Sequence, residues 1–326
     1  MIRARIIGTG SAVPDRVLTN FDLEKMVDTS DEWITTRTGI KERRIAAEGE
    51  YTSTFAALAA RRALEMAGVP AVDVDLIIVG TLSPDFPFPS TACLVQSELK
   101  ATRATAFDLS AACSGFVYAL SVAEKFIGSG AMRRALVIGA EVMSRTVDWT
   151  DRNTCLLFGD GAGAVLLEVC DDGRGVQSTH LHSDGSYWEL LYQAGCGSRN
   201  PAVQKTLDEQ LVYLTMQGNE VFKLAVRAME EAALEALQAN GCSTTDIGLF
   251  IPHQANRRII DAIGKRLGLA DHQLFVNLER YGNTSAASIP IALDEAHRAG
   301  RIRDNDIVLF DAFGGGLTWG SALIRW

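Results

Sequence analysis

Short apolar runs and longer helix-forming stretches alternate along this chain. Residues 74–80, VDLIIVG, form an almost unbroken apolar run typical of a buried strand, and they follow TFAALAARRALEMA at 54–67, where strong helix formers recur. The stretch 219–239 contains helix formers throughout, and the Asn-Gly pair after it is a stop signal. Another apolar run, IGLFIP, follows at 247–252. This alternation predicts an α/β protein with buried strands.

Two segments of the chain share one plan. Each has an apolar strand, a turn of small residues, and a helix that ends at a glycine before the next apolar strand. These landmarks fall at Gly80, Cys113 and Gly130 in the first segment and at His253, Asn283 and Gly300 in the second. The first interval is 33 residues (80 to 113) against 30 (253 to 283), and the second is 17 in both segments.

The agreement has two explanations. Alternating elements impose similar lengths on any two α/β segments, so coincidence is one of them. Duplication is the interpretation we favour, and it predicts two halves, 1–174 and 175–326, related by a pseudo-twofold axis. His253 would then lie at the carboxyl end of a strand, which is where open α/β sheets bind ligands.

Composition and charge narrow the function classes. The chain has 326 residues with 31 Lys and Arg against 40 Asp and Glu, a net charge of −9, which excludes a generic nucleic-acid binder. No apolar run approaches the roughly 18 residues that a membrane-spanning helix needs, and the start of the chain lacks a secretory apolar region. The six cysteines form no CxxC pair, which favours free thiols. We therefore expect a cytoplasmic protein that contacts no membrane.

Cys113 is the candidate nucleophile. It lies in DLSAACSGF, where small residues permit a sharp turn directly before a helix. The positive end of a helix macrodipole stabilises a thiolate, so we expect a lowered thiol pKa and a nucleophile that needs no dedicated base. The competing interpretation is a small buried apolar residue, which is what most cysteines are.

His253 in IPHQAN and Asn283 in GNTSAAS are candidate hydrogen-bond donors. A structural histidine and a plain helix N-cap are the alternatives for the two residues. Together with Cys113, they describe a site with one thiolate and two neutral donors. Such a site suits carbon–carbon bond formation, because both donors can stabilise one carbonyl oxygen that becomes an enolate.

Five motifs, DLSAACSGF, GDGAGA, HQAN, GNTSAAS and FGGGLTWGSALIRW, occur in this order. Through them the chain resembles β-ketoacyl-acyl carrier protein synthase III over nearly its whole length. The resemblance implies a thiolase-like fold, with two similar halves forming five layers (αβαβα). It also implies that an acyl-CoA primer, here expected to be acetyl-CoA, acylates the cysteine, after which malonyl-acyl carrier protein decarboxylates and attacks the thioester. The products would be acetoacetyl-acyl carrier protein, CO2 and CoA, which initiates fatty acid synthesis.

The resemblance also assigns roles to individual residues. Cys113 would be the nucleophile, His253 and Asn283 would stabilise the enolate, and the backbone N–H groups of Cys113 and Gly315 would form an oxyanion hole. The residues expected to bind CoA or its pantetheine arm are Trp33, Arg37, Arg152, Asn219 and Asn256. Those expected to bind the acidic acyl carrier protein lie on the helix after His253 and are Arg257, Arg258, Lys265 and Arg266.

The resemblance implies a homodimer in which Phe88 reaches across the interface to close the partner's acyl pocket. A bulky residue there favours a short primer. Residues 187–213, however, depart from the family pattern near the substrate entrance, which leaves primer length open. A ketosynthase of a specialised pathway with a longer or branched primer is therefore an alternative. An acyltransferase that acts on oxygen or nitrogen is another, although it would need a base more than a second amide donor.

Three further patterns resemble cofactor-binding or metal-binding motifs but are incomplete. GTGSAV at 8–13 has Val13 where a dinucleotide fingerprint has its third glycine, and GDGAGA at 159–164 lacks an assignable acidic ribose partner. His180 and His182 with Asp184 lack a spaced fourth ligand, which makes them weak evidence for zinc. We expect no nicotinamide, flavin or metal ion.

Overall fold

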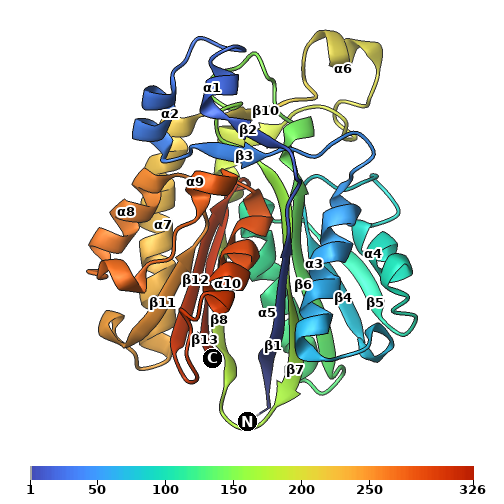
Figure 1. Ribbon diagram of the computed structural model, residues 1–326, viewed down its shortest axis with the longest axis vertical. Coiled ribbons are helices and arrows are strands. Elements are labelled where there is room, and N and C mark those ends of the chain that lie inside the picture. The colour runs from blue at the N-terminus through green and yellow to red at the C-terminus, as the bar shows by residue number, and fades with distance from the viewer. Residues whose placement is uncertain (1) are drawn as a thin grey trace.

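The computed structural model describes residues 2–326 and contains two mixed β-sheets (Figure 1). The first has the strand order β1-β7-β6-β4-β5, with β1 Arg3–Ala12, β4 Leu76–Gly80, β5 Thr105–Leu109, β6 Arg134–Val142 and β7 Asp160–Cys170. The second has the order β11-β12-β13-β8, with β8 Gly175–Ser183, β11 Ile247–Pro252, β12 Ile307–Gly314 and β13 Thr318–Arg325. The chain passes from the first sheet to the second between Cys170 and Gly175.

The two sheets have the same connectivity. β4 runs parallel to β6, which is antiparallel to β7, which is antiparallel to β1. In the second sheet β11 runs parallel to β12, which is antiparallel to β13, which is antiparallel to β8. An isolated parallel bridge between Phe250 and Leu274 takes the place that β5 has beside β4. The duplicated architecture predicted from the sequence is therefore present.

Helices complete five layers. The outer helices α3 (Thr52–Ala67) and α4 (Thr91–Leu99) cover the first sheet, and α7 (Gly218–Ala239) and α8 (Arg257–Arg266) cover the second. Between the sheets lie α5 (Gly115–Gly128) and α10 (Ser288–Arg298), which pack with both sheets in one apolar core. Figure 1 shows these two central helices between the sheets. The predicted αβαβα arrangement is confirmed.

Shorter elements gather at one end of the molecule. They are β2 Val17–Thr19, α1 Asn20–Leu23, α2 Asp31–Thr38, β3 Glu42–Arg44, β9 Leu191–Gln193, α6 Gln204–Asp208, β10 Leu214–Met216 and α9 Leu278–Tyr281. Figure 1 shows α1, α2, α6, β2, β3 and β10 at the upper end. Residues 187–213, the segment that the sequence analysis singled out near the substrate entrance, contribute β9 and α6 to this group.

Each central helix begins after a single 3₁₀ turn. The turn Ala112–Ser114 precedes α5 and the turn Ser285–Ala287 precedes α10. Both turns start on a residue with positive φ, +46° at Ala112 and +49° at Ser285. This shared geometry makes Ala112 the counterpart of Ser285. The sequence alignment of Cys113 with Asn283 is therefore wrong by three residues. The interval from Gly80 to Ala112 equals that from His253 to Ser285, but Cys113 lies within its turn whereas Asn283 lies two residues before its own.

Gly8 and Gly10 allow β1 to pack closely against α3. A Cβ on Gly10 of β1 would lie 2.2 Å from the backbone oxygen of Ala59, and one on Gly8 would lie 2.2 Å from that of Ala63. The strand thus lies directly against α3, whose alanines allow the close approach.

No helix within residues 2–326 is long and apolar enough to cross a membrane.

Replacing Gly10 with alanine should lower the free energy of unfolding by about 1–3 kcal/mol, because the new methyl group overlaps the α3 backbone. Urea unfolding of the purified protein measures this change. Gly185→Ala is the matched control, since a Cβ at Gly185 meets nothing within 4 Å. Equal stability of the two variants would contradict the packing argument.

Candidate active site

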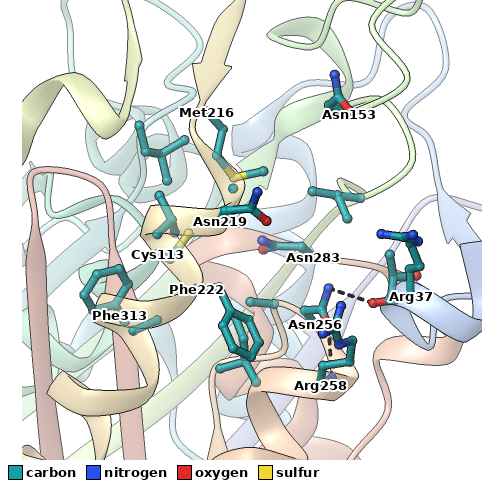
Figure 2. A pocket seen from close by; sticks show the side chains of 18 of the residues that line it. Arg37, Cys113, Asn153, Met216, Asn219, Phe222, Asn256, Arg258, Asn283 and Phe313 are labelled. Carbon is teal, nitrogen blue, oxygen red and sulfur yellow. Dashed lines mark hydrogen bonds between the residues drawn. The ribbon is translucent and has the colours of Figure 1, made fainter.

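One cavity of about 730 Å³ brings Cys113, His253 and Asn283 together. Cys113 comes from the turn before α5, His253 from the end of β11, and Asn283 from the segment between α9 and α10. Figure 2 shows Cys113 and Asn283 on the wall of this cavity. The structure thus unites the three residues that the sequence selected, although they belong to different halves of the chain.

The Cys113 thiol is buried, with 7% of the residue exposed. Burial raises the pKa of this thiol to about 12; the nearby Glu141 carboxylate adds to the increase, whereas the Ser285 hydroxyl opposes it. The sequence prediction of a lowered pKa is therefore wrong. Loss of hydration outweighs the helix terminus, and the thiol keeps its proton at neutral pH.

His253 is held as a neutral donor. Its Nδ1 lies 2.7 Å from Ser288 Oγ, which also accepts a hydrogen bond from the Gln254 backbone N–H at 3.3 Å. Among the hydrogen bonds of residues 2–326, His253 Nδ1 is the one acceptor for the Ser288 hydroxyl proton. Nε2 therefore carries the ring proton. Burial lowers the pKa of His253 to about 3, so the ring is neutral at pH 7.

The Asn283 amide is oriented by its own turn. Its Oδ1 accepts the Ser285 backbone N–H at 2.8 Å, which leaves the Nδ2 hydrogens available to a ligand. The backbone is fixed as well, because Asn283 N–H donates to Leu157 O at 2.8 Å and Gly159 N–H donates to Asn283 O at 3.0 Å. The GDGAGA motif, which begins at Gly159, thus supports the site.

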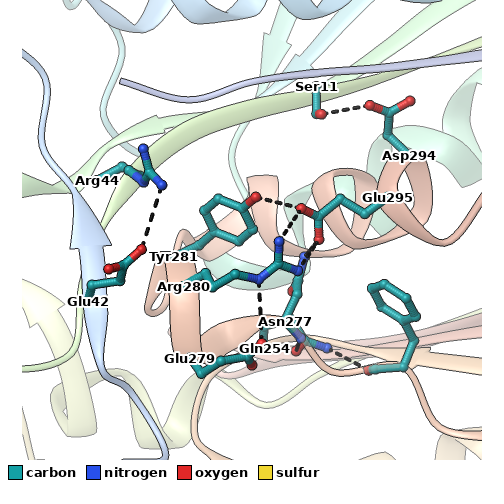
Figure 3. A network of polar contacts seen from close by, with 11 residues as sticks. Ser11, Glu42, Arg44, Gln254, Asn277, Glu279, Arg280, Tyr281, Asp294 and Glu295 are labelled. Atoms are coloured by element: carbon teal, nitrogen blue, oxygen red, sulfur yellow. Dashed lines mark hydrogen bonds and ion pairs between the residues drawn. The ribbon is translucent and has the colours of Figure 1, made fainter. Parts of the chain in front are cut away.

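A polar network that runs from the interior to the surface supports the loop that carries His253 (Figure 3). Gln254 Oε1 accepts the Asn277 backbone N–H at 3.1 Å, and Asn277 Nδ2 donates to Glu295 at 2.7 Å. Glu295 also pairs with Arg280 at 2.9 Å and accepts the Tyr281 hydroxyl. These contacts tie the segments on both sides of the cavity to α10.

The cavity mouth carries the residues expected to bind CoA. Arg37 and Arg152 place their guanidinium carbons 4.9 and 4.6 Å from the centre of the Trp33 ring. Asn219 and Asn256 line the same cavity, and Asn256 Nδ2 donates to Arg37 O at 3.2 Å. All five predicted residues are therefore brought together.

Most of the other predicted residues lie outside the cavity. Phe88 is 86% exposed in the loop before α4, and its predicted role needs a second subunit. Gly315 packs against Leu191, while the preceding Gly314 lines the cavity and lies against the Cys113 N–H. The oxyanion role of Gly315 stays a prediction. Of the basic residues of α8, Arg258 lines the cavity, and the others are exposed on the helix: Arg257, Lys265 and Arg266.

His180 and His182 bind a single carboxylate. His180 Nδ1 lies 3.1 Å and His182 Nε2 lies 2.6 Å from the Glu235 oxygens. Asp184 accepts instead from the Ser186 N–H and hydroxyl. The structure thus separates the residues that the sequence grouped as a weak metal candidate.

The sequence analysis missed several functional side chains. Ser285 and Ser288 contact the chemistry-bearing residues, and Glu141 lies behind the nucleophile. The two serines follow Asn283 within the same motif, which was the available signal. Apolar side chains that line the cavity had no comparable signal: Leu191, Met216, Phe222, Met229 and Phe313.

Comparison with known proteins agrees with this geometry. Residues 107–185 match the family 3-oxoacyl-[acyl-carrier-protein] synthase III, and residues 237–326 match the C-terminal part of that family. A relative from Caldanaerobacter subterraneus subsp. tengcongensis, a β-ketoacyl-[acyl-carrier-protein] synthase III, is 54% identical over 100% of this chain and 98% of its own length. The protein of that name from Xylella fastidiosa is 55% identical over 100% of this chain and 99% of its own.

A solved structure gives the same result. The crystal structure of 3-oxoacyl-[acyl-carrier-protein] synthase III from Aquifex aeolicus superposes with a TM-score of 0.93 at 53% identity, covering 99% of this chain and 100% of that one. With the cysteine, histidine and asparagine in one cavity, this chain belongs to the β-ketoacyl-acyl carrier protein synthase III family of condensing acyltransferases.

Proposed function

We propose that this enzyme condenses acetyl-CoA with malonyl-acyl carrier protein through an acyl-enzyme on Cys113. The observation that carries the proposal is the convergence of one thiol and two neutral donors, His253 Nε2–H and Asn283 Nδ2–H, in a single cavity. We also propose that it works in the cytoplasm as a homodimer without a cofactor. Its six free cysteines suit a reducing compartment.

In the first half-reaction, the Cys113 sulfur attacks the acetyl thioester carbon, and the bond to the CoA sulfur breaks. The tetrahedral oxyanion would be held by the Cys113 N–H and by a backbone N–H of the glycine turn. Gly314 already lies so close that its Cβ would fall 2.7 Å from Cys113 N. Glycine is needed there because any side chain would block the approach.

In the second half-reaction, malonyl-acyl carrier protein loses CO2, and the electron pair of the broken bond forms an enolate. Negative charge grows on the thioester oxygen, where His253 Nε2–H and Asn283 Nδ2–H donate. Both donors are oriented before the substrate arrives, by Ser288 and by the Ser285 backbone. Fixed donors in a dry cavity stabilise such charge far better than water does. The enolate carbon then attacks the acetyl thioester and releases the Cys113 thiolate.

The shape of the cavity suits a pantetheine arm. Apolar side chains such as Phe222 and Met216 line it, and Asn219 and Asn256 offer amides near the mouth. The adenine of CoA would stack on Trp33 by replacing one of its two arginine contacts. The displaced guanidinium would then be free to bind the CoA phosphates.

Dimerisation is supported by the free edge of the first sheet. β5 is the last strand of that sheet, and its outer edge is available for pairing with a second copy. Phe88, in the nearby loop before α4, is an exposed aromatic side chain that a partner subunit would cover.

Basic residues of α8 suit an acidic carrier protein. Arg257 and Arg266 are engaged with Asp261 and Glu230, whereas none of the ion pairs within residues 2–326 involves Lys265. Such surface pairs are weak and exchange readily for a partner's carboxylates.

Intact-mass analysis after addition of acetyl-CoA tests the acyl-enzyme. Wild type and Asn283→Ala should gain an acetyl group, whereas Cys113→Ala should gain none. After malonyl-acyl carrier protein is added, Asn283→Ala should release CO2 about 100-fold more slowly than wild type, because one enolate donor is lost. An acetylated Cys113→Ala protein would contradict the assignment of Cys113 as the nucleophile. If only longer acyl-CoA primers acylate the enzyme, the mechanism stands and the primer is not acetyl-CoA. If the enzyme is acylated but releases no CO2, the acyltransferase alternative is favoured.

Ser288→Ala should slow condensation about tenfold, since His253 loses the hydroxyl that keeps its proton on Nε2. Acetylation of Cys113 should continue at nearly the wild-type rate. Single-turnover kinetics of each half-reaction measure the two effects separately. An unchanged condensation rate would show that Ser288 does not set the tautomer.

Lys265→Glu should raise KM for malonyl-acyl carrier protein about fivefold at low salt and leave KM for malonyl-CoA unchanged, because only the protein substrate meets this surface. Lys125→Glu, an equal charge change on an exposed residue of α5, is the control. Equal KM values for the two variants would argue against a docking role for α8.

A further inference from the structure

Thr318, the first residue of β13, holds both ends of the turn that carries the nucleophile. This turn, Ala112–Ser114, is called the nucleophile turn below. The Thr318 hydroxyl donates to Ala111 O at 2.8 Å, on the residue before the turn. The Thr318 backbone oxygen accepts the Ser114 hydroxyl at 3.0 Å, on the last residue of the turn. The two half-reactions described above give Thr318 no role.

The same hydroxyl also reaches residues 315–317, which join β12 to β13 and are called the glycine turn below. Thr318 Oγ1 lies 3.3 Å from Gly315 O, so its single proton is shared between the carbonyl groups of Ala111 and Gly315. The nucleophile turn belongs to the first half of the chain and the glycine turn to the second. Thr318 is therefore a direct link between the two backbone segments that would supply the oxyanion donors.

The nucleophile turn needs such a link because its backbone is strained. Ala112 has a φ of +46°, in the left-handed region that a residue with a β-carbon disfavours. The Ser114 N–H closes the turn by donating to Ala111 O at 3.1 Å, and Thr318 holds this same carbonyl group. Relaxation of Ala112 toward negative φ would rotate the peptide that carries the Cys113 N–H.

The strand that leads into the glycine turn contacts the nucleophile turn. A Cβ on Gly314, the last residue of β12, would lie 2.7 Å from Cys113 N and 3.2 Å from Ala111 O. The next residue is Gly315, and none of the hydrogen bonds found within residues 2–326 uses its backbone N–H. An unpaired N–H one residue from this contact is available to a developing oxyanion.

We propose that Thr318 is the positioning residue of the oxyanion hole. Its hydroxyl keeps the nucleophile turn and the glycine turn in the relative position at which the N–H groups of Cys113 and Gly315 point to one carbonyl oxygen. Thr318 is not among the residues that line the cavity, so it acts through the two backbone segments. The inference rests on the proposed function, in which Cys113 forms an acyl-enzyme.

The position of these donors matters wherever a tetrahedral intermediate forms on the acetyl group. One forms when the Cys113 sulfur attacks acetyl-CoA, and another forms when the enolate carbon attacks the acetylated cysteine. Decarboxylation differs, because its negative charge grows on the malonyl thioester oxygen, to which His253 and Asn283 donate. The link through Thr318 therefore serves both attacks on the acetyl carbonyl group and does not serve the loss of CO2.

Thr318→Val tests this role, since it removes the hydroxyl and keeps the shape of the side chain. The acetylation rate of Cys113 at saturating acetyl-CoA should fall about 30-fold, less than the roughly 100-fold that complete loss of an oxyanion donor costs. The acetyl-CoA concentration for half-saturation should stay at the wild-type value, because the side chains at the cavity mouth are unaltered. Rapid quenching and intact-mass analysis measure both quantities. Thr318→Ser keeps the hydroxyl and should react at nearly the wild-type rate.

Thr179→Val is the matched control. Thr179 lies on β8, which pairs with β13, and its hydroxyl bonds to the Ser121 hydroxyl of α5 at 2.7 Å. The variant thus removes a threonine hydroxyl that contacts the helix after Cys113 but leaves the nucleophile turn intact. It should be acetylated at the wild-type rate.

A second readout separates a displaced oxyanion hole from a distorted cavity. Thr318→Val that has been acetylated by long incubation should release CO2 from malonyl-acyl carrier protein at nearly the wild-type rate. The hydrogen bonds that orient the two enolate donors are unchanged in this variant. Because the enolate carbon attacks the acetyl group more slowly, part of it takes a proton from solvent. Mass analysis of the products should then find acetyl-acyl carrier protein beside acetoacetyl-acyl carrier protein.

The outcomes are distinct. Wild-type acetylation of Thr318→Val, equal slowing in Thr179→Val, or CO2 release that falls in step with acetylation would each overturn the positioning role alone. If Thr318→Val does not fold, Ser114→Ala decides the question, because it removes the other hydrogen bond between Thr318 and the turn. It should slow acetylation about tenfold, and a wild-type rate would overturn the proposal. A wild-type protein that takes up no acetyl group would overturn the proposed function and the positioning role with it.

Discussion

The close approach of the two turns that begin the central helices is the constraint on which the site depends. A Cβ on Gly139 of β6 would lie 2.1 Å from the backbone oxygen of Ala286, and one on Gly80 would lie 2.7 Å from the backbone carbon of Gly115. The absence of a side chain at Gly139 lets the second-half turn reach the sheet of the first half, and its absence at Gly80 lets α5 begin directly against the same sheet. Cys113 and Asn283 meet in one cavity for this reason.

Burial then sets the charge state of the site. Removal from water raises the pKa of the Cys113 thiol and of the Glu141 carboxyl group and lowers that of the His253 ring. All three shifts favour the uncharged form, as expected for a cavity of low polarity. The resting site is thus built from neutral donors and a protonated thiol, and the charge that develops during reaction meets groups that are already oriented.

The orientation comes from residues that do not themselves react. Ser288 sets the proton on His253, the Ser285 backbone turns the Asn283 amide, and Glu295 ties the supporting loops to α10. The contacts to His253 and Asn283 come from the first residue of α10 and the turn before it. A single short motif, GNTSAAS, therefore supplies both a reacting group and the geometry around it.

Local and repeating features were readable from the sequence. The alternation of apolar strands and helices, the duplicated plan and the three chemistry-bearing residues follow from composition and spacing, because strands and helices have fixed periods and strand ends gather at one edge of a sheet. Phe88 and the basic residues of α8 were also identified, but their roles depend on a second protein, which a single chain does not reveal.

The proton chemistry depended on the folded structure. The sequence placed Cys113 at a helix terminus and so predicted a thiolate, whereas burial leaves it protonated. The register of the two turns, the tautomer of His253 and the hydrogen bond from Ser285 to Glu141 were also unreadable from the chain. These features depend on distances between residues far apart in sequence and on how completely water is excluded from the site. Both the distances and the exclusion of water are set only when the two halves pack together.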